Sequence, residues 1–322
     1  MLVGGLLGTL PDLDVLVQYT DAVASFTYHR SWSHSLITLT LISPVIAWLL
    51  HRYFPRRWVI STARLNLNEP SSIAPGFSLW CLTVWLILIT HPILDGFTIY
   101  GTQLYWPIPT EPVAIGSIFI IDPAYTLPLI VGMIVAWRGR QQARRAVLIG
   151  LFVSSIYLGF TLISQHHARR VAIDSLSQQG LATTNVLVAP APFAVFWRIV
   201  SMDKDYYHEG FYSLFDERQE MEFDQYSTNR DLIESNQDHW PITRLDWFTS
   251  GMISAEQSAG SLVINDLRMG IESSYVFRFS VGDMSDRQLA PATSTLLPMK
   301  FDQVRMRKLM QRVLNEHVDI SP

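Results

Sequence analysis

Four apolar runs within the first 170 residues constrain this chain more than any other feature. They cover residues 35–50, 77–94, 118–137 and 146–164. A helix that crosses a bilayer needs about 20 mostly apolar residues, so the runs predict about four transmembrane helices. Residues 1–10 (MLVGGLLGTL) are apolar but too short to span. They predict an N-terminal apolar segment, either the end of a longer helix or a re-entrant piece.

The composition changes after the last of these runs. The first 170 residues contain no lysine, and all three lysines and most of the acids follow them. Alternating patterns at 185–202, 205–215 and 261–283 predict strands, and the segments 227–239 and 302–317 predict helices. We therefore expect an α-helical, membrane-embedded domain at 1–167 and a small α+β soluble domain at 168–322.

Charge and cysteine content exclude several classes of protein. The formal net charge of −4 gives no signal for nucleic-acid binding. The single cysteine, Cys81, lies inside an apolar run, so neither an internal disulfide nor a cysteine-based zinc site is expected.

Basic residues in the short loops predict the orientation. The loops at 51–57 and 138–145 are rich in arginine, whereas the connection at 96–117 has no Lys or Arg. Because cytoplasmic loops carry an excess of basic residues, the 96–117 connection should face outward. The C-terminal domain is then expected to be extracytoplasmic.

This topology collects seven acids and histidines at the outer membrane boundary. His91 and Asp95 are spaced i, i+4 and would share a helix face. The prediction places His34 in the first turn of its helix, with Ser31 as the candidate N-cap. The complete set is Asp12, Asp14, His29, His34, His91, Asp95 and Asp122.

Carboxylates and imidazoles without thiolates suit Zn²⁺, Mn²⁺ or Fe²⁺. Several of each suit a cluster of two or more ions, which can activate water for attack at phosphorus. Each piece also has a plainer interpretation: an Asp-x-Asp is often a turn, and two histidines five apart are often structural. His91 and Asp95 favour function, because ionisable groups in spanning segments are costly. Arg30 would bind either an anionic substrate group or lipid headgroups.

The order of the motifs resembles the YdjM-like family of bacterial inner-membrane proteins, described as metal-dependent hydrolases. The resemblance rests on PDLD, HRSWSHS, HPILDGFTIYGTQLYWP and FIIDPAYTLPL, and on APAPFAVFWRIV and EGFYSLFD near the C-terminus, and it covers nearly the whole chain. It implies metal-site helices similar to those of phospholipase C and P1 nuclease. It also implies that Asp12, Asp14, His29, His34, His91 and Asp95 are the ligands, while Asp122 matches a further position of the pattern.

Two departures from the family pattern stand out. Ser31 and Ser33 replace a glycine and a threonine that many relatives carry in the histidine motif. Relatives also have a longer apolar segment before the Asp-x-Asp, and a ligand from that segment would be missing here.

Two hypotheses about function follow. In the first, the protein is a membrane-bound metal-dependent hydrolase that cleaves a phosphoester of a lipid or lipid-linked substrate, with Arg30 and Asp122 in catalytic roles. In the second, the metal is structural and the C-terminal domain binds an envelope partner. An open coordination position distinguishes them, because structural sites are closed. Transport is disfavoured, since no polar path crosses the four runs.

Overall fold

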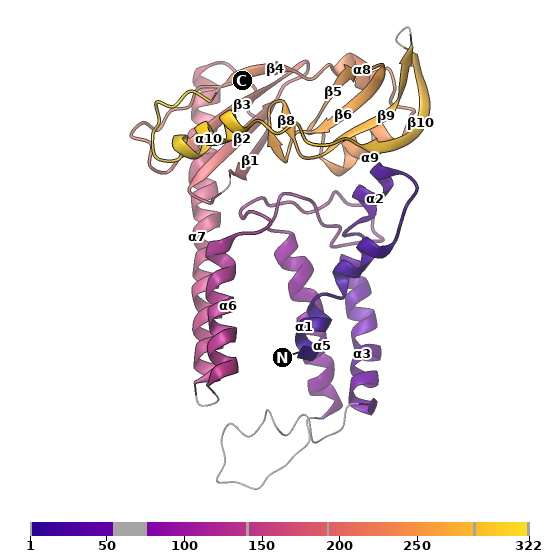
Figure 1. Cartoon of the computed structure of the whole chain (residues 1–322), viewed down its shortest axis with the longest axis vertical. Coiled ribbons are helices and arrows are strands. Elements are labelled where there is room, and N and C mark those ends of the chain that lie inside the picture. Colours follow the sequence, from indigo (N-terminus) through magenta and orange to yellow (C-terminus); the bar gives the residue numbers. More distant parts are fainter. Residues whose placement is uncertain (1, 54–75, 140–141, 192, 286–287, 321–322) are drawn as a thin grey trace.

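The computed structural model describes residues 2–53, 76–139, 142–191, 193–285 and 288–320. Most of the first arginine-rich loop and part of the second lie outside these ranges, so the orientation stays a prediction. The described chain forms a helical part and a β-rich C-terminal domain stacked along one axis (Figure 1).

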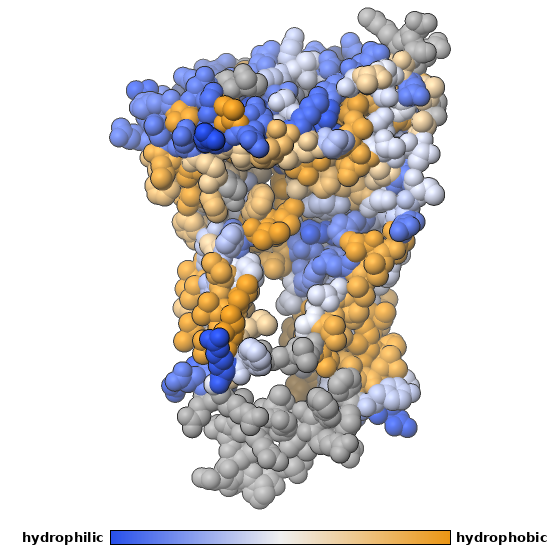
Figure 2. Space-filling model, in the orientation of Figure 1, coloured by the Kyte–Doolittle hydropathy of each residue, from blue (hydrophilic) through white to orange (hydrophobic). Residues whose placement is uncertain are grey.

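The helical part contains two groups of long helices. In the first group α3 packs against α5, with the short α1 against α5; in the second group α6 packs against α7. Figure 2 shows an opening between the two groups. The bounds are α1 Leu2–Gly8, α3 Leu36–Tyr53, α5 Phe77–Asp95, α6 Pro123–Arg138 and α7 Ala143–Gln178.

Three described helices, α3, α5 and α7, are long and apolar enough to cross a membrane. The third predicted run forms α6, which has only 16 residues because Asp122 and Pro123 begin the helix five residues into the run. Large apolar side chains such as Leu41, Phe152 and Ile163 point away from the protein. An apolar exterior of this kind suits contact with lipid.

Small residues hold α6 against α7. A Cβ atom on Gly150 would lie 2.5 Å from the carbonyl oxygen of Pro128, and one on Gly132 would lie 2.8 Å from that of Ala146. The two backbones therefore approach as closely as glycine allows, which is a common device where apolar helices associate in membranes.

Three short elements connect the N-terminal helix to α3. They are the 3₁₀ helix η1 Pro11–Leu16, the helix α2 Ala22–Tyr28 and the 3₁₀ turn η2 Trp32–His34. They lie between the long helices and the C-terminal domain (Figure 1).

The C-terminal domain contains two antiparallel four-stranded sheets, ordered β1-β2-β3-β4 and β10-β9-β6-β5. The predicted strands correspond to β1–β3, β6 and β9, whereas β4, β5, β10 and the helix α9 Trp240–Phe248 were not predicted. The strands are β1 Asn185–Pro190, β2 Phe196–Met202, β3 Tyr206–Ser213, β4 Asp224–Ser227, β5 Ile253–Ser258, β6 Ser261–Asp266, β7 Gly270–Ile271, β8 Ser274–Tyr275, β9 Arg278–Ser285 and β10 Gln288–Leu296.

The two predicted helices of this domain form as α8 Arg230–Glu234 and α10 Gln303–Arg312. Helix α7 continues unbroken through the expected boundary at 167/168. Its last turns pack Ala168, Val171 and Leu176 against Trp197 and Ile199 of the first sheet. One helix therefore ties the apolar part to the C-terminal domain.

The second sheet packs on α2. Phe26 and Tyr100 belong to the same buried cluster as Phe248 and Phe279 of the C-terminal domain. The side chain of Asp21 caps α2 through the Ala24 N–H and also accepts a hydrogen bond from the Ser294 N–H. This contact holds the C-terminal domain against α2, beside η1.

Candidate metal centre

Four of the six predicted ligands come together at the junction of η1, η2 and the last turn of α5. One donor atom from each of Asp12, His34, His91 and Asp95 lies within 4.8 Å of the other three. The His34 Nε2 atom is 3.4 Å from Asp12 Oδ1 and 3.2 Å from Asp95 Oδ2. The His91 Nε2 atom is 3.3 Å and 3.4 Å from the same two oxygens.

These distances suit a shared ion better than pairwise hydrogen bonds. A charge-assisted N–H···O contact settles at about 2.7–2.9 Å, shorter than all four. Ligands at about 2.0–2.1 Å from a tetrahedral ion lie roughly 3.3–3.4 Å apart. The four nitrogen–oxygen distances, 3.2–3.4 Å, are close to that value.

Several donor atoms of the group are buried without a hydrogen-bond partner in the described ranges. The Nε2 atoms of His34 and His91 and the Oδ2 atom of Asp95 are buried and have no hydrogen-bond partner among the described residues. Buried polar atoms are nearly always paired. Three such atoms facing one point, with two imidazoles and two carboxylates as donors, fit a divalent cation.

The second nitrogen of each histidine is held in place. His91 Nδ1 lies 2.8 Å from the Gly8 carbonyl oxygen, which can only accept, so Nδ1 carries the proton. His34 Nδ1 lies 2.9 Å from the hydroxyl of Ser33, which donates at 2.6 Å to Asp14 Oδ2. In the neutral rings both contacts place the proton on Nδ1 and leave the Nε2 lone pair free for a metal.

Local sequence explains why η1 separates its two acids. Pro11 starts a 3₁₀ helix, in which successive residues turn by about 120°. Asp12 and Asp14 therefore point in different directions, and Asp12 alone enters the group. The sequence left open whether the two carboxylates face one ion or bridge two; among the described residues, Asp12 joins the group of four and Asp14 does not.

Asp14 and His29 instead form a pair beside the group. Asp14 Oδ1 is 2.8 Å from His29 Nδ1, and its Oδ2 accepts from the Arg30 N–H and the Ser33 hydroxyl. Burial raises the pKa of Asp14, but these hydrogen bonds outweigh it and hold the pKa below the usual value. Asp14 is therefore ionised and orients both histidines, directly at His29 and through Ser33 at His34.

The turn before α3 differs from its prediction. The Ser31 hydroxyl donates to the Tyr28 carbonyl and caps no helix, so the predicted N-cap is wrong. Ser35 takes that place and accepts from the Thr38 N–H. His34 therefore ends η2, one residue before the cap and two before α3 begins, and it is fully buried.

Arg30 lies beside the carboxylate of Asp95. Its Nε is 3.4 Å from Asp95 Oδ2, its Nη1 donates to Thr98 Oγ1, and its guanidinium lies over the Tyr100 ring. The left-handed backbone of Arg30, at φ 59°, turns the chain so that its own N–H reaches Asp14.

Asp122 does not join the four residues. Its Oδ1 accepts from the N–H groups of Ala124 and Tyr125 at the start of α6, and Tyr157 donates to Oδ2. The carboxylate that was predicted to be catalytic is a helix cap in this structure. The Asp-Pro pair that opens the helix carried that signal.

Three contributors to the site were missed by the sequence argument. Gly8 acts through its backbone carbonyl, Ser33 through its hydroxyl and Thr98 through its contact with Arg30. Ser33 alone left a visible trace, because a hydroxyl is kept where relatives carry threonine.

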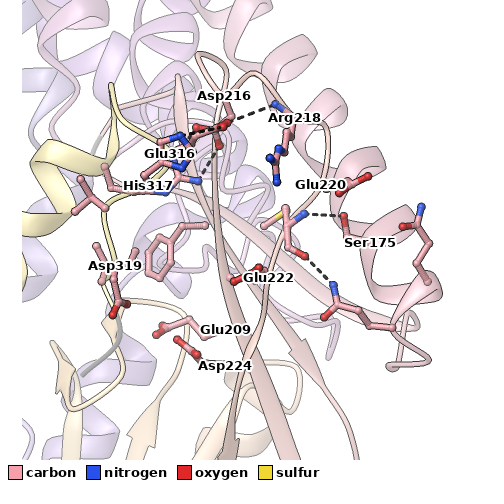
Figure 3. A pocket seen from close by; sticks show the side chains of 18 residues that line it. Ser175, Glu209, Asp216, Arg218, Glu220, Glu222, Asp224, Glu316, His317 and Asp319 are labelled. Carbon is pink, nitrogen blue, oxygen red and sulfur yellow. Dashed lines mark hydrogen bonds and ion pairs between the residues drawn. The ribbon is translucent and has the colours of Figure 1, made fainter.

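The acids between Asp216 and Asp224 are mostly exposed, as a solvated face requires, and Asp216, Glu220, Glu222 and Asp224 line a cavity of about 530 Å³ (Figure 3). Asp216 makes a bidentate pair with Arg312, and Glu316 accepts from the Glu217 N–H. Across the described ranges, the ligand atoms of these acids do not converge as those of Asp12, His34, His91 and Asp95 do.

Comparison with known proteins agrees with this architecture. The model of the YdjM inner membrane protein family matches residues 1–168, which include every residue of the metal centre. The chain belongs to the YdjM inner membrane protein family. Membership and the three apolar helices together make it a membrane protein.

One curated relative, the uncharacterized protein YfhP of Bacillus subtilis (strain 168), is 22% identical over 189 residues. The match covers 59% of this chain, and the chain spans about half (51%) of the relative's length. No solved structure matches the chain, so the expected likeness to phospholipase C and P1 nuclease stays a prediction.

Proposed function

We propose that this protein is a membrane-bound metal-dependent hydrolase that cleaves a phosphoester of a lipid or lipid-linked substrate. The observation that carries the proposal is the convergence of Asp12, His34, His91 and Asp95 on one point. A divalent ion held there, Zn²⁺ with Mn²⁺ or Fe²⁺ as alternatives, would supply the Lewis acidity for attack at phosphorus. We propose that the site holds two or more such ions.

Exposure of the ligands favours catalysis over a purely structural site. The His34 side chain is fully buried, whereas 46% of the Asp12 side chain is exposed. Solvent therefore reaches the group from the Asp12 side. Four protein ligands would fill a tetrahedral ion, and catalytic sites keep a position for water or substrate. Catalysis therefore requires that the ion takes a further ligand or that the exposed Asp12 gives up its place. The alternative, a structural metal with a C-terminal domain that binds an envelope partner, predicts no exchangeable position.

The protein's own residues would divide the work. His34 and His91 would bind the ion through Nε2, with their rings oriented by Ser33 and Gly8 at Nδ1. Arg30 partly balances the carboxylate charge at Asp95 and offers a cation beside the group for a phosphate oxygen. Asp14 keeps His29 oriented at the edge of the site.

The lipid nature of the substrate rests on location. The group lies where α5 ends, next to helices with apolar exteriors, so a substrate could arrive laterally from the bilayer. We propose a multi-pass topology in which α6 also spans. The metal centre and C-terminal domain would then face the outer side of the inner membrane, as the arginine-rich loops indicate.

Metal content tests the proposal first. Detergent-purified protein should contain close to stoichiometric Zn, Mn or Fe, and the double variant His91→Ala/Asp95→Ala should lose it. The variant His51→Ala is the matched control, because His51 lies near the other end of α3. It should retain the metal.

Activity is then measured on phosphatidic acid and on an isoprenyl diphosphate in mixed micelles. Phosphate release that the double variant lacks and the His51→Ala variant keeps would support a hydrolase. Stoichiometric metal that does not exchange, together with no hydrolysis of either lipid, would favour the structural alternative. Absence of metal from the wild-type protein would contradict both.

A further inference from the structure

A cavity of about 650 Å³ lies between η1, α2 and the second sheet of the C-terminal domain. One wall comes from Val17 and Tyr19, which follow η1 in the chain, and from Phe26 of α2. The opposite wall comes from Phe277 and Leu296 of the C-terminal domain. Ligand pockets typically enclose about 300–1,000 Å³, so the volume suits a sizeable group.

Most of the lining is aromatic or aliphatic, and the uncharged polar side chains in it are those of Gln18, Thr20, Ser25, Ser294 and Thr295. Tyr28, Tyr100 and Phe279 add further rings, and no Lys or Arg stands among the described residues that form the walls. The single acid, Asp14, is already hydrogen-bonded to His29, Arg30 and Ser33. Such a surface suits an uncharged hydrocarbon group and disfavours a phosphate.

The cavity adjoins the metal centre. Asp14 and His29 both line it, and the ring of His29 lies 5.8 Å from that of His34, centroid to centroid. A molecule with its phosphoester at the four ligands would therefore have this cavity within reach of its next few atoms.

The rim of the cavity is apolar and exposed. Val15 and Val17 line the cavity and are 64% and 45% exposed, and Leu13 and Leu16 of the same 3₁₀ helix are exposed beside them. Exposed apolar side chains clustered next to apolar helices mark a contact with membrane lipid or with a ligand.

We propose that this cavity binds the hydrocarbon chain of a membrane lipid whose phosphate group lies at the metal centre. The inference rests on the proposed function and adds to it a role for the C-terminal domain, which supplies one wall of the substrate pocket. The domain would then select lipids by the chain next to the phosphate.

The test uses full-length protein in liposomes containing phosphatidylglycerol with a diazirine in its acyl chain. After illumination, mass spectrometry of peptides should place cross-links within residues 14–29 and 277–296. The variant Ser25→Trp should fill the cavity from α2, and Leu296→Arg should place a charge in the opposite wall. Each should lower these cross-links at least fivefold.

Ser177→Trp is the matched control, because Ser177 is an exposed helical serine outside the cavity. It should leave the cross-links unchanged. Cross-links confined to α3, α5, α6 and α7, or equal in wild type and both cavity variants, would overturn the proposal.

Metal content of the same samples separates this inference from the proposed function. Protein with bound metal but without cavity cross-links would refute the lipid pocket alone. Protein with cavity cross-links but without metal would retain the pocket and refute the hydrolase. Two variants from opposite walls, each with normal metal content, guard against loss of folding in either one.

Discussion

The Nδ1 atom of His91 lies 2.8 Å from the carbonyl oxygen of Gly8, the last residue of α1. This contact makes a seven-residue helix part of the metal centre. Leu7 is buried in the same cluster as Leu88 of α5, so the helix is anchored where its carbonyl is needed. The N-terminal apolar segment therefore contributes a backbone contact to the candidate metal centre.

At His34 the corresponding contact comes from a side chain and can be removed by substitution. The variant Ser33→Ala deletes the hydroxyl between His34 Nδ1 and Asp14 Oδ2. Loss of such an outer contact weakens metal affinity by about 10–100-fold. Competition with a chromogenic chelator would measure this loss.

The control for Ser33→Ala is Ser31→Ala. The Ser31 hydroxyl bonds only to the Tyr28 carbonyl and does not touch the four ligands. Its affinity for metal should stay within a factor of two or three of wild type. Equal affinities for both variants would mean that Ser33 does not orient His34.

The candidate metal ligands could be predicted as far as spacing determines them. Residues spaced i, i+4 share a helix face, so His91 and Asp95 were expected to lie side by side, and the structure confirms this. Asp12 and Asp14 could not be separated in advance, because two residues in a turn point together whereas two in a 3₁₀ helix do not. Pro11 is compatible with either a turn or the start of a 3₁₀ helix, and the structure shows the helix η1.

The fold likewise contains elements that the sequence predicts and elements that it does not. Long apolar runs predicted α3, α5 and α7, because length and hydropathy alone decide them. The strands β5 and β10 were missed since their sequences contain few branched apolar residues, and pairing with β6 and β9 stabilises them. The junction of α2 with the second sheet, which creates the lipid cavity, joins residues more than 200 positions apart and leaves no local pattern.

Arg30 should affect anion binding more than metal binding. Its guanidinium lies 3.4 Å from Asp95 Oδ2 and repels a cation at the same carboxylate. In the variant Arg30→Gln metal should bind at least as tightly as in wild type. Inorganic phosphate should bind the metal-loaded variant about 10- to 150-fold more weakly, because one charge-assisted hydrogen bond contributes about 1.5–3 kcal/mol.

Isothermal titration with phosphate would measure the effect. Arg52→Gln, at the far end of α3, serves as the control and should bind phosphate as wild type does. Unchanged phosphate affinity in Arg30→Gln would assign Arg30 to structure rather than to substrate.

A buried ion network stabilises the C-terminal domain independently of the metal. Glu209 is almost fully buried and pairs with Arg198 at 2.6 Å and with Arg305 of α10 at 3.4 Å. The variant Glu209→Gln leaves two buried guanidiniums without a carboxylate. Breaking such a network costs about 3–5 kcal/mol, so the melting temperature should fall by roughly 10 °C.

Thermal unfolding in detergent would show this change. The control Glu234→Gln removes an exposed i, i+4 pair with Arg230 and should change the melting temperature by about 1 °C or less. Metal content should be normal in both variants. A stable Glu209→Gln protein would show that the arginines find other partners.

The close contact of α6 and α7 gives the last prediction. In the variant Gly150→Leu the new side chain meets the Pro128 carbonyl, which lies 2.5 Å from the site of its Cβ, so the two helices must separate. Such overpacking costs about 1–3 kcal/mol or more and should lower the melting temperature in detergent. Gly159→Leu is the matched control, because Gly159 lies on the same helix and its Cβ would have no neighbour within 4 Å. If both variants melted alike, the glycine contact would not hold α6 against α7.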